Sequence, residues 1–216
     1  MKHFFKNVPF LNFKNTQKRE SIMKCIELEK NKTKKIMLNA FLELLNKKQY
    51  HDITIGKIAD DAGVGRRTFY RYFLDKESMV LYVIDLMMDR FAQMLIGNVG
   101  KSNKGKEGIK DIARIYFLFW EEYIEELRLL HRAGLSHYIG DNLEQYIFQV
   151  AKKSNHLSRE LSQDQIMTYY EKYKYAFAYR LAGYWRVTLL WCEEQPRKTP
   201  DEMSVILSDI MTMSED

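Results

Sequence analysis

The chain has 216 residues, of which 46% are hydrophobic and 29% are charged. It contains only 10 Gly and 3 Pro and shows no run of alternating polarity, so we predict an all-α protein rather than a turn-rich β fold. Its longest apolar stretches, 112–120 and 176–192, contain arginines and fall short of the roughly 20 apolar residues of a membrane span. With no apolar signal region and two cysteines without metal-like spacing, we expect a soluble, cytoplasmic protein.

Charge is unevenly distributed along the chain. Residues 1–76 hold 17 Lys and Arg against 8 Asp and Glu, a balance of +9, whereas the remainder holds 17 against 21, a balance of −4. DNA affinity depends strongly on neutralising phosphates and releasing counterions. The asymmetry therefore predicts a basic, N-terminal DNA-binding domain joined to a domain that does not bind DNA, and a steep salt dependence.

Residues 1–30 form an N-terminal extension that is basic and contains four phenylalanines. Two interpretations are open. The segment is either a flexible arm that reaches a neighbouring minor groove, or the product of a non-native translation start with Met23 as the true first residue.

The first predicted helix lies within 31–50, and a helix-turn-helix follows between Ile53 and Ser78. In the first helix the apolar positions with helical spacing are Ile36, Ala40, Phe41, Leu44 and Leu45. Thr54 is placed to cap the next helix, and Gly63 supplies the backbone dihedrals of a tight turn between two helices. This order of elements is typical of DNA-binding domains.

The second helix of this motif has an apolar and a polar side. Phe69 and Phe73 are one turn apart and are expected to face the core. Arginine bonds guanine at two atoms, and the N-terminal end of a recognition helix reaches base edges. We therefore predict base contacts by Arg66 and Arg67, the alternative being a solvated basic face; Arg71 is equally suited to pair with an acid.

Residues 55–76 resemble the DNA-binding domain of the TetR family of bacterial regulators, and the resemblance extends over 31–95. The sequences of this family roughly follow the pattern T-[IV]-x-x-I-A-x-x-A-G-V-S-x-x-T-[FL]-Y-x-[YH]-F-x-x-K-E. The resemblance implies major-groove contacts by Arg66, Arg67 and Tyr70. It further implies phosphate contacts by Thr54, Thr68, Tyr70, Tyr72 and Lys76. The chain departs from the family at Gly65, which has no hydroxyl, so that this phosphate contact is lost or passes to a backbone N–H.

The resemblance divides the chain into the extension, a three-helix DNA-binding domain at 31–76, and a helical ligand-binding and dimerisation bundle at 77–216. Within the bundle, patterning predicts a linker helix at 76–96, a loop at 97–108, and further helices at 109–132, 135–153 and 163–194, with a possible break at Gly140. Residues 155–162 are the expected connection. Thr199, Pro200 and Glu202 have the spacing of a capping box that starts the last helix.

Dimerisation is implied by the family, whose last two helices usually pair across a two-fold axis. Two recognition helices about 34 to 36 Å apart are needed to read successive major grooves, which one copy cannot provide. The predicted interface residues are Leu189, Met203, Ile206, Leu207 and Ile210. The alternative is that the apolar positions of the last helix seal the core of their own subunit.

Aromatic residues concentrate on two helices of the bundle and are suited to line a pocket for a hydrophobic or aromatic effector. The candidate pocket residues are Tyr116, Trp120, Tyr123, Tyr173, Phe177, Arg180 and Tyr184. The alternative is that they fill the core and the dimer seam. Arg180 and Arg186 either meet an acidic group of the ligand or pair with glutamates in 121–126.

Catalytic signals are weak. His137 and Asp141 are one helical turn apart with His131 nearby, but no third ligand has metal spacing, and phosphate loops, nucleophile elbows and paired cysteines are missing. We predict no enzymatic activity, metal or cofactor. The expected function is that of a homodimeric repressor released from a palindromic DNA operator by a small molecule, and the alternative is a DNA-anchored interaction or architectural protein without such a switch.

Overall fold

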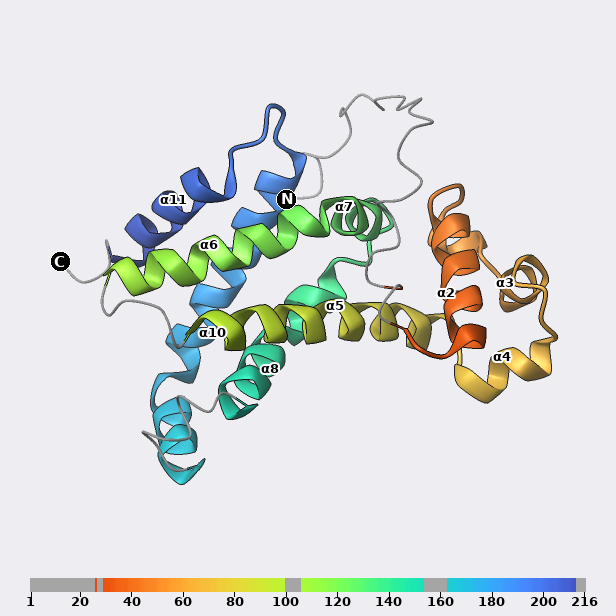
Figure 1. Ribbon diagram of the computed structural model, residues 1–216, viewed down its shortest axis with the longest axis horizontal. Helices are drawn as coiled ribbons and strands as arrows, with labels where there is room; N and C mark the ends of the chain where they lie inside the picture. Colours follow the sequence, from red (N-terminus) through yellow and green to blue (C-terminus); the bar gives the residue numbers. More distant parts are fainter. Residues whose placement is uncertain (1–25, 27–28, 100–105, 154–162, 213–216) are drawn as a thin grey trace.

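The computed structural model describes residues 26, 29–99, 106–153 and 163–212 (Figure 1). Every regular element in these ranges is a helix, which confirms the predicted all-α class. None of the described helices is long and apolar enough to cross a membrane. Most of the N-terminal extension lies outside the described residues, and so does the whole of the expected connection at 155–162.

The helices follow one another in a simple order, with three short elements after the first. In chain order they are α2 (Lys32–Leu45), the 3₁₀ helix η2 (Tyr50–Asp52), α3 (Ile55–Asp61), α4 (Arg66–Tyr72), α5 (Lys76–Val99), α6 (Lys106–Glu122), α7 (Ile124–Arg132), α8 (His137–Lys153), α10 (Gln163–Glu193) and α11 (Pro200–Thr212).

Helices α2, α3 and α4 form the domain that the sequence predicts to bind DNA, and it lies at one end of the molecule (Figure 1). Local capping starts the first two of them. The side chain of Asn31 accepts hydrogen bonds from the N–H groups of Thr33 and Lys34 at 3.0 and 3.1 Å, and Thr54 Oγ1 accepts one from the N–H of Lys57 at 3.2 Å. The cap that the sequence predicts at Thr54 is thus confirmed.

Helix α5 connects this domain to the body of the molecule. Asp75 caps this helix, because Asp75 Oδ1 accepts a hydrogen bond from the N–H of Ser78 at 2.7 Å. The helix continues through Gly97 to Val99, and α6 begins at Lys106, so the predicted loop at 97–108 is shorter than expected.

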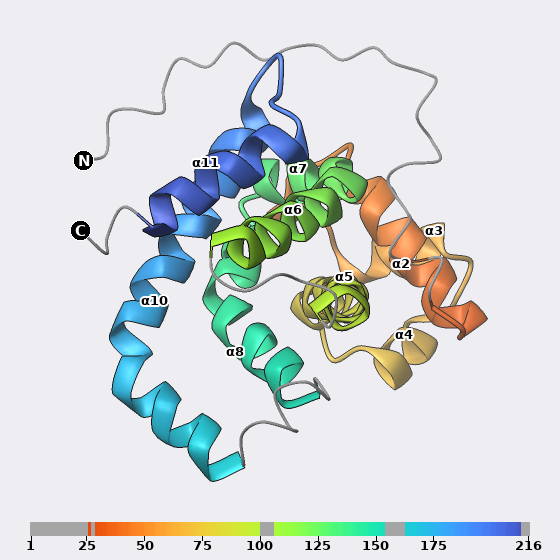
Figure 2. The same cartoon turned by 60° about the vertical axis from the view of Figure 1, so that its left-hand side comes forward.

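In the body, α6 lies between α5 and α11, while α10 lies against α7 and α8 (Figure 2).

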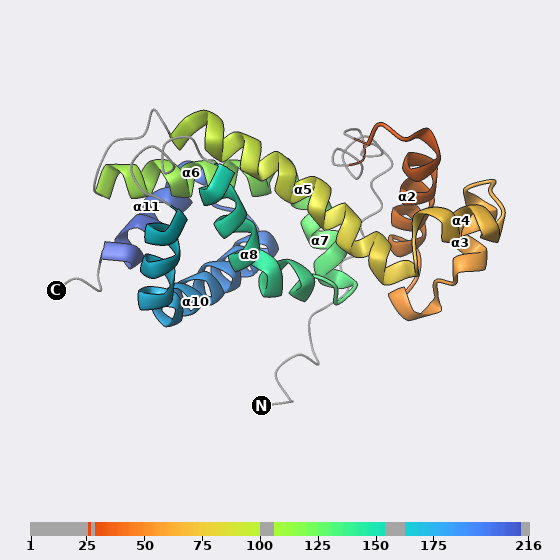
Figure 3. The same ribbon diagram turned by 90° about the horizontal axis from the view of Figure 1, so that it is seen from below.

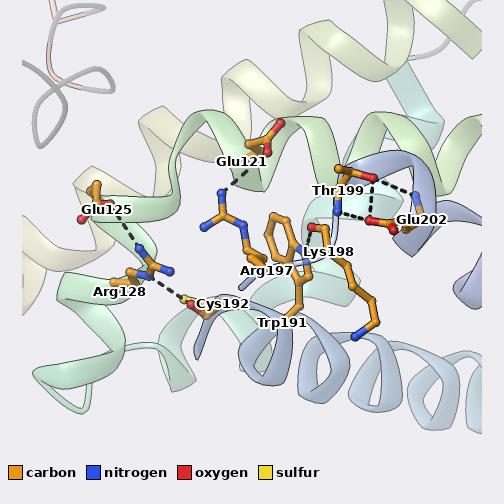
Figure 4. Close-up of polar contacts among 9 residues, drawn as sticks. All are labelled: Glu121, Glu125, Arg128, Trp191, Cys192, Arg197, Lys198, Thr199 and Glu202. Atoms are coloured by element: carbon orange, nitrogen blue, oxygen red, sulfur yellow. Dashed lines mark hydrogen bonds and ion pairs between the residues drawn. The ribbon is translucent and has the colours of Figure 1, made fainter. Parts of the chain in front are cut away.

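Side-chain contacts hold the segment between α10 and α11 in place (Figure 4). Trp191 Nε1 donates to the carbonyl of Lys198 at 2.7 Å, and the Arg197 guanidinium lies 4.8 Å from the centre of the Trp191 ring. The capping box is confirmed, since the N–H of Thr199 donates to Glu202 Oε2 at 2.7 Å and the N–H of Glu202 donates to Thr199 Oγ1 at 3.2 Å.

Two predictions about the middle of the chain were wrong. The expected single helix at 109–132 is broken at Tyr123, whose φ of −109° and ψ of 26° leave the helical range and redirect α7. Gly140 does not interrupt α8. A Cβ at Gly140 would lie 2.5 Å from Trp185 Cδ1, so the glycine allows α8 and α10 to approach closely.

Candidate nucleic-acid interface

The turn between α3 and α4 fixes the orientation of the recognition helix. Gly63 has a φ of +64°, a conformation that other residues rarely adopt. Its N–H donates to the carbonyl of Asp60 at 3.1 Å, and the N–H of Val64 donates to that of Ala59 at 2.9 Å. Val64 is half-buried against the core, so both ends of the turn are tied to the domain.

Helix α4 has a buried aromatic side and an exposed polar side, as the residue spacing predicts. Phe69 and Phe73 are buried with their ring centroids 5.9 Å apart. Arg66 and Arg67 are exposed, and 57% of the surface of Tyr70 is accessible. An exposed aromatic hydroxyl beside two exposed arginines on a rigid helix is chemically suited to contact base edges and phosphates.

The two arginines are not equivalent. The guanidinium of Arg66 lies over Gly56 near the start of α3, where a Cβ would come within 2.7 Å of Arg66 Nη2. Thr54, which also lies at the start of α3, is exposed although its hydroxyl serves as the cap. Arg66 and Thr54 therefore both lie where α4 meets the beginning of α3.

Arg71 and Tyr72 form a contact at the end of α4. The Arg71 guanidinium lies 5.0 Å from the centre of the Tyr72 ring, an aromatic partner in place of the acid considered above. Hydrogen bonds with Asn31 and Thr33 lower the pKa of Tyr72. Tyr72 and Thr68 are both half-buried, and Tyr72 joins the end of α4 to the start of α2.

Lys76 is directed at the protein rather than at solvent. Its ammonium group donates to the carbonyls of Tyr50 at 2.7 Å, Ile53 at 3.2 Å and His51 at 3.5 Å, and lies 4.2 Å from the centre of the Tyr50 ring. The resemblance implied a phosphate contact here, whereas in this structure the group caps the carbonyls around η2. Every residue has a backbone carbonyl, so the sequence does not indicate which carbonyls Lys76 bonds, and this structural role was not predicted.

Tyr82 is a second residue that the sequence reasoning missed. Its ring lies 4.2 Å from Lys34 Nζ of α2 and 5.7 Å from the ring of Phe73, and its hydroxyl donates to Glu29. Burial, followed by the hydrogen bond to Glu29, raises the pKa of Tyr82 to about 12. A polar hydroxyl among the apolar residues of α5 was the sequence feature that could have indicated this role.

The structure brings together some of the predicted pocket residues. Tyr116, Trp120 and Tyr123 are buried, and the hydroxyl of Tyr116 lies 2.7 Å from Thr188 Oγ1. Burial raises the pKa of Tyr116 to about 12. The hydroxyl of Tyr184 is shielded from solvent and has no hydrogen-bond partner among the described residues.

Other predicted pocket residues are less buried than this cluster. Phe177 is half-buried against the core, whereas Tyr173 and Arg180 are exposed. The glutamates expected to pair with Arg180 or Arg186 include two that have another partner. Glu121 pairs with Arg197 at 3.6 Å. Similarly, Glu125 pairs with Arg128 at 3.3 Å.

The predicted dimer residues divide into buried and exposed groups. Leu189, Met203 and Leu207 are buried within the chain, so their side chains offer no surface to a second copy. Ile206 is half-buried, and Ile210 is exposed. Helix α11 uses its inner face against α6, which is the alternative that the sequence left open.

His131 and His137, the two histidines of the body within the described residues, have separate partners. His131 lies 2.9 Å from Ser136 Oγ and 3.0 Å from Glu193 Oε1, whereas His137 Nδ1 lies 2.8 Å from the carbonyl of Gly134. Within the part of the chain that the structure describes, no group of three or more metal-ligating side chains is gathered.

Comparison with known proteins connects these features to a family. Residues 37–83 match the model of the bacterial regulatory proteins of the tetR family. Over 66 residues the chain is 32% identical to the HTH-type dhaKLM operon transcriptional activator DhaS of Lactococcus lactis subsp. lactis (strain IL1403), a match that covers 31% of this chain and about a third (34%) of that relative.

Similar solved structures include the dihydroxyacetone kinase operon activator DhaS, with 15% identity, 84% of this chain and 95% of that chain covered, and a TM-score of 0.45. The fatty acid degradation regulator FadR from Bacillus halodurans has 15% identity, coverages of 85% and 96%, and a TM-score of 0.48.

The turn geometry, the exposed side chains of α4 and the basic N-terminal segment together form a helix-turn-helix that is chemically suited to bind DNA. Over residues 37–83 this helix-turn-helix segment is similar to the bacterial regulatory proteins of the tetR family.

Proposed function

We propose that the protein is a homodimeric, cytoplasmic repressor that binds a palindromic operator and leaves it when a small molecule binds the helical body. The exposed Arg67 and Tyr70 on a helix fixed by the Gly63 turn are the observation that carries the DNA-binding part. Arg66 acts beside them, while Thr54, Thr68 and Tyr72 support the phosphate contacts.

A second copy is proposed to dock on the last two helices through their outward faces. On α10, positions spaced by three or four residues form one exposed stripe that consists of Tyr175, Tyr179, Ala182, Arg186 and Leu190. On α11, Val205 and Ile210 are exposed. These residues replace the buried Leu189, Met203 and Leu207 in the proposed interface.

The effector is proposed to act near the buried Tyr116–Thr188 pair and Tyr184. The groups that surround this point are aromatic rings and hydroxyls, which favour a hydrophobic or aromatic molecule with a hydrogen-bonding group. Release follows if the ligand prefers a dimer whose two recognition helices are wrongly spaced for the operator.

Activation instead of repression is the second candidate. The relative with 32% identity over 66 residues is named as an activator of an operon. A reporter gene placed behind the selected operator separates the two, because a repressor lowers its expression and an activator raises it.

The test is selection of binding sites from random duplex DNA at about 150 mM salt, where non-specific contacts are already weakened. We expect a palindrome, and we expect Arg67→Ala to weaken binding by about 1 to 3 kcal/mol and to relax the preference at one base position. Lys57→Ala removes one charge from the same domain but lies in α3, paired with Asp61 at 2.6 Å, and serves as control. Recovery of no sequence above background, or a monomer of 25.9 kDa by light scattering on the selected duplex, contradicts the proposal.

A further inference from the structure

Two tyrosines of α8 lie near two carboxylates of α5 at the same spacing, and one of them forms a hydrogen bond. The hydroxyl of Tyr146 donates to Asp85 Oδ1 at 2.8 Å. Eight residues earlier on each helix, Tyr138 faces the carboxylate of Glu77, and burial, followed by this carboxylate, raises the pKa of Tyr138. Equal spacing on both helices means that α5 and α8 run in the same direction and in register, as their packing in Figure 3 shows.

Both tyrosines are suited to hold one helix against the other. Their rings are half-buried against the hydrophobic core, so the side chains are fixed by packing as well as by their hydroxyls. Burial and the hydrogen bond to Asp85 also raise the pKa of Tyr146, which keeps its hydroxyl protonated as a donor. We call the two pairs, Tyr138 with Glu77 and Tyr146 with Asp85, the tyrosine latch.

The same segment of α5 holds the DNA-binding domain with its other side chains. Lys76, the neighbour of Glu77, bonds the carbonyls around η2. Tyr82, three residues before Asp85, contacts Phe73 of the DNA-binding domain and Lys34 of α2. Within the first three turns of α5, some side chains therefore contact the DNA-binding domain and others contact α8.

We propose that Tyr138 and Tyr146 are positioning residues for DNA binding: the tyrosine latch locks α5, and with it the DNA-binding domain, to α8. From Asp85 to Lys76 is nine residues, or about 13 Å along a helix axis. A shift of about 1 Å at the latch therefore tilts the recognition helix by several degrees relative to the body. Two recognition helices must keep a spacing of about 34 to 36 Å, so a loose latch lowers the affinity for two half-sites at once.

This inference rests on the proposed dimeric function, and the experiment separates the two. In the full-length protein, Tyr146→Phe, Tyr138→Phe, Asp85→Asn and the double variant Tyr146→Phe/Asp85→Asn are compared for affinity to the selected palindrome and to a duplex with one half-site. Phenylalanine keeps the packed ring and removes only the hydroxyl. Asp89→Asn is the matched control, because Asp89 is an exposed carboxylate one turn further along α5 that acts on Tyr146 through its charge, whereas Asp85 accepts the hydrogen bond.

We expect each latch variant to lose roughly tenfold in its preference for the palindrome over the half-site, within the factors of about 5 to 150 seen for coupled sites. The double variant should lose no more than either single variant, because both changes remove the same hydrogen bond. Asp89→Asn should retain the wild-type ratio. An unchanged ratio in the latch variants, or equal losses on both duplexes, overturns the latch.

If the wild-type protein shows no preference for a palindrome, the proposed function fails and the latch is judged by amide hydrogen exchange. We expect Tyr146→Phe to accelerate exchange at the start of α5 and around η2, while Asp89→Asn does not. Identical exchange in the wild type and Tyr146→Phe overturns the latch independently of any operator.

Discussion

The DNA-binding domain and the body of this protein are built on different scales. In the former, α3 and α4 have seven residues each and are joined by a turn that one glycine makes possible. In the latter, α10 has 31 residues and the core is a network of aromatic contacts, such as Trp120 with Trp185 at 5.5 Å. A helix of two turns has a single buried face, which its few apolar residues identify. A long helix can pack different faces against different neighbours along its length.

The largest expected effect tests the division between the two sides of α4. Phe69→Ala removes a fully buried ring and should lower the free energy of unfolding by about 3 to 5 kcal/mol. Tyr70→Ala, at the adjacent exposed position, should change it by only about 0.5 kcal/mol while weakening DNA binding. Urea denaturation and operator binding measure the two effects. Equal losses of stability in both variants would show that α4 is rotated from its described orientation.

A smaller effect tests whether Lys76 serves the fold or the DNA. Lys76→Met keeps the aliphatic stem and removes the donor to the carbonyls around η2, so it should cost about 1.5 to 3 kcal/mol of stability, the range for hydrogen bonds from a charged group. Lys57→Met removes an equal charge from an exposed pair with Asp61 and should change stability much less. If Lys76→Met leaves the unfolding midpoint unchanged and flattens the salt slope of DNA binding by about one, the phosphate role is correct.

The smallest effect uses two glycines of the turn that differ in backbone conformation and in their position relative to α4. A Cβ at either Gly63 or Gly65 would meet no atom within 4 Å. Gly65 has an ordinary φ of −77° at the N-cap of α4, so Gly65→Ser should raise the unfolding free energy by about 0.5 kcal/mol by adding a cap and restricting the unfolded chain. Gly63→Ser, at a φ of +64°, should instead lower it by about 1 kcal/mol. Thermal unfolding gives both signs, and stabilisation at both positions would refute the assigned turn.

Much of the DNA-binding domain was accessible from local sequence. The caps at Thr54 and Asp75, the turn at Gly63 and the spacing of Phe69 and Phe73 all involve residues at most five positions apart. The capping box at Thr199 was found in the body for the same reason. Such features involve one helical turn, and the residue types themselves carry the chemistry.

Predictions in the body were less secure because they required knowledge of neighbouring helices. Met203 and Leu207 were assigned to a dimer surface, yet they face α6. An apolar stripe indicates that a helix face is covered, but not whether its own chain or a second copy covers it. The break at Tyr123 was missed for a related reason, since apolar spacing continues across it.

The sequence by itself determined the all-α class, the helix-turn-helix and the side of α4 that faces outward, because these follow from helical periodicity, capping and one positive-φ glycine. Only the tertiary structure decided that Lys76 bonds the carbonyls around η2 and that Tyr146 bonds Asp85. These contacts join residues 23 to 61 positions apart. Their existence depends on how whole helices pack, which no local pattern specifies.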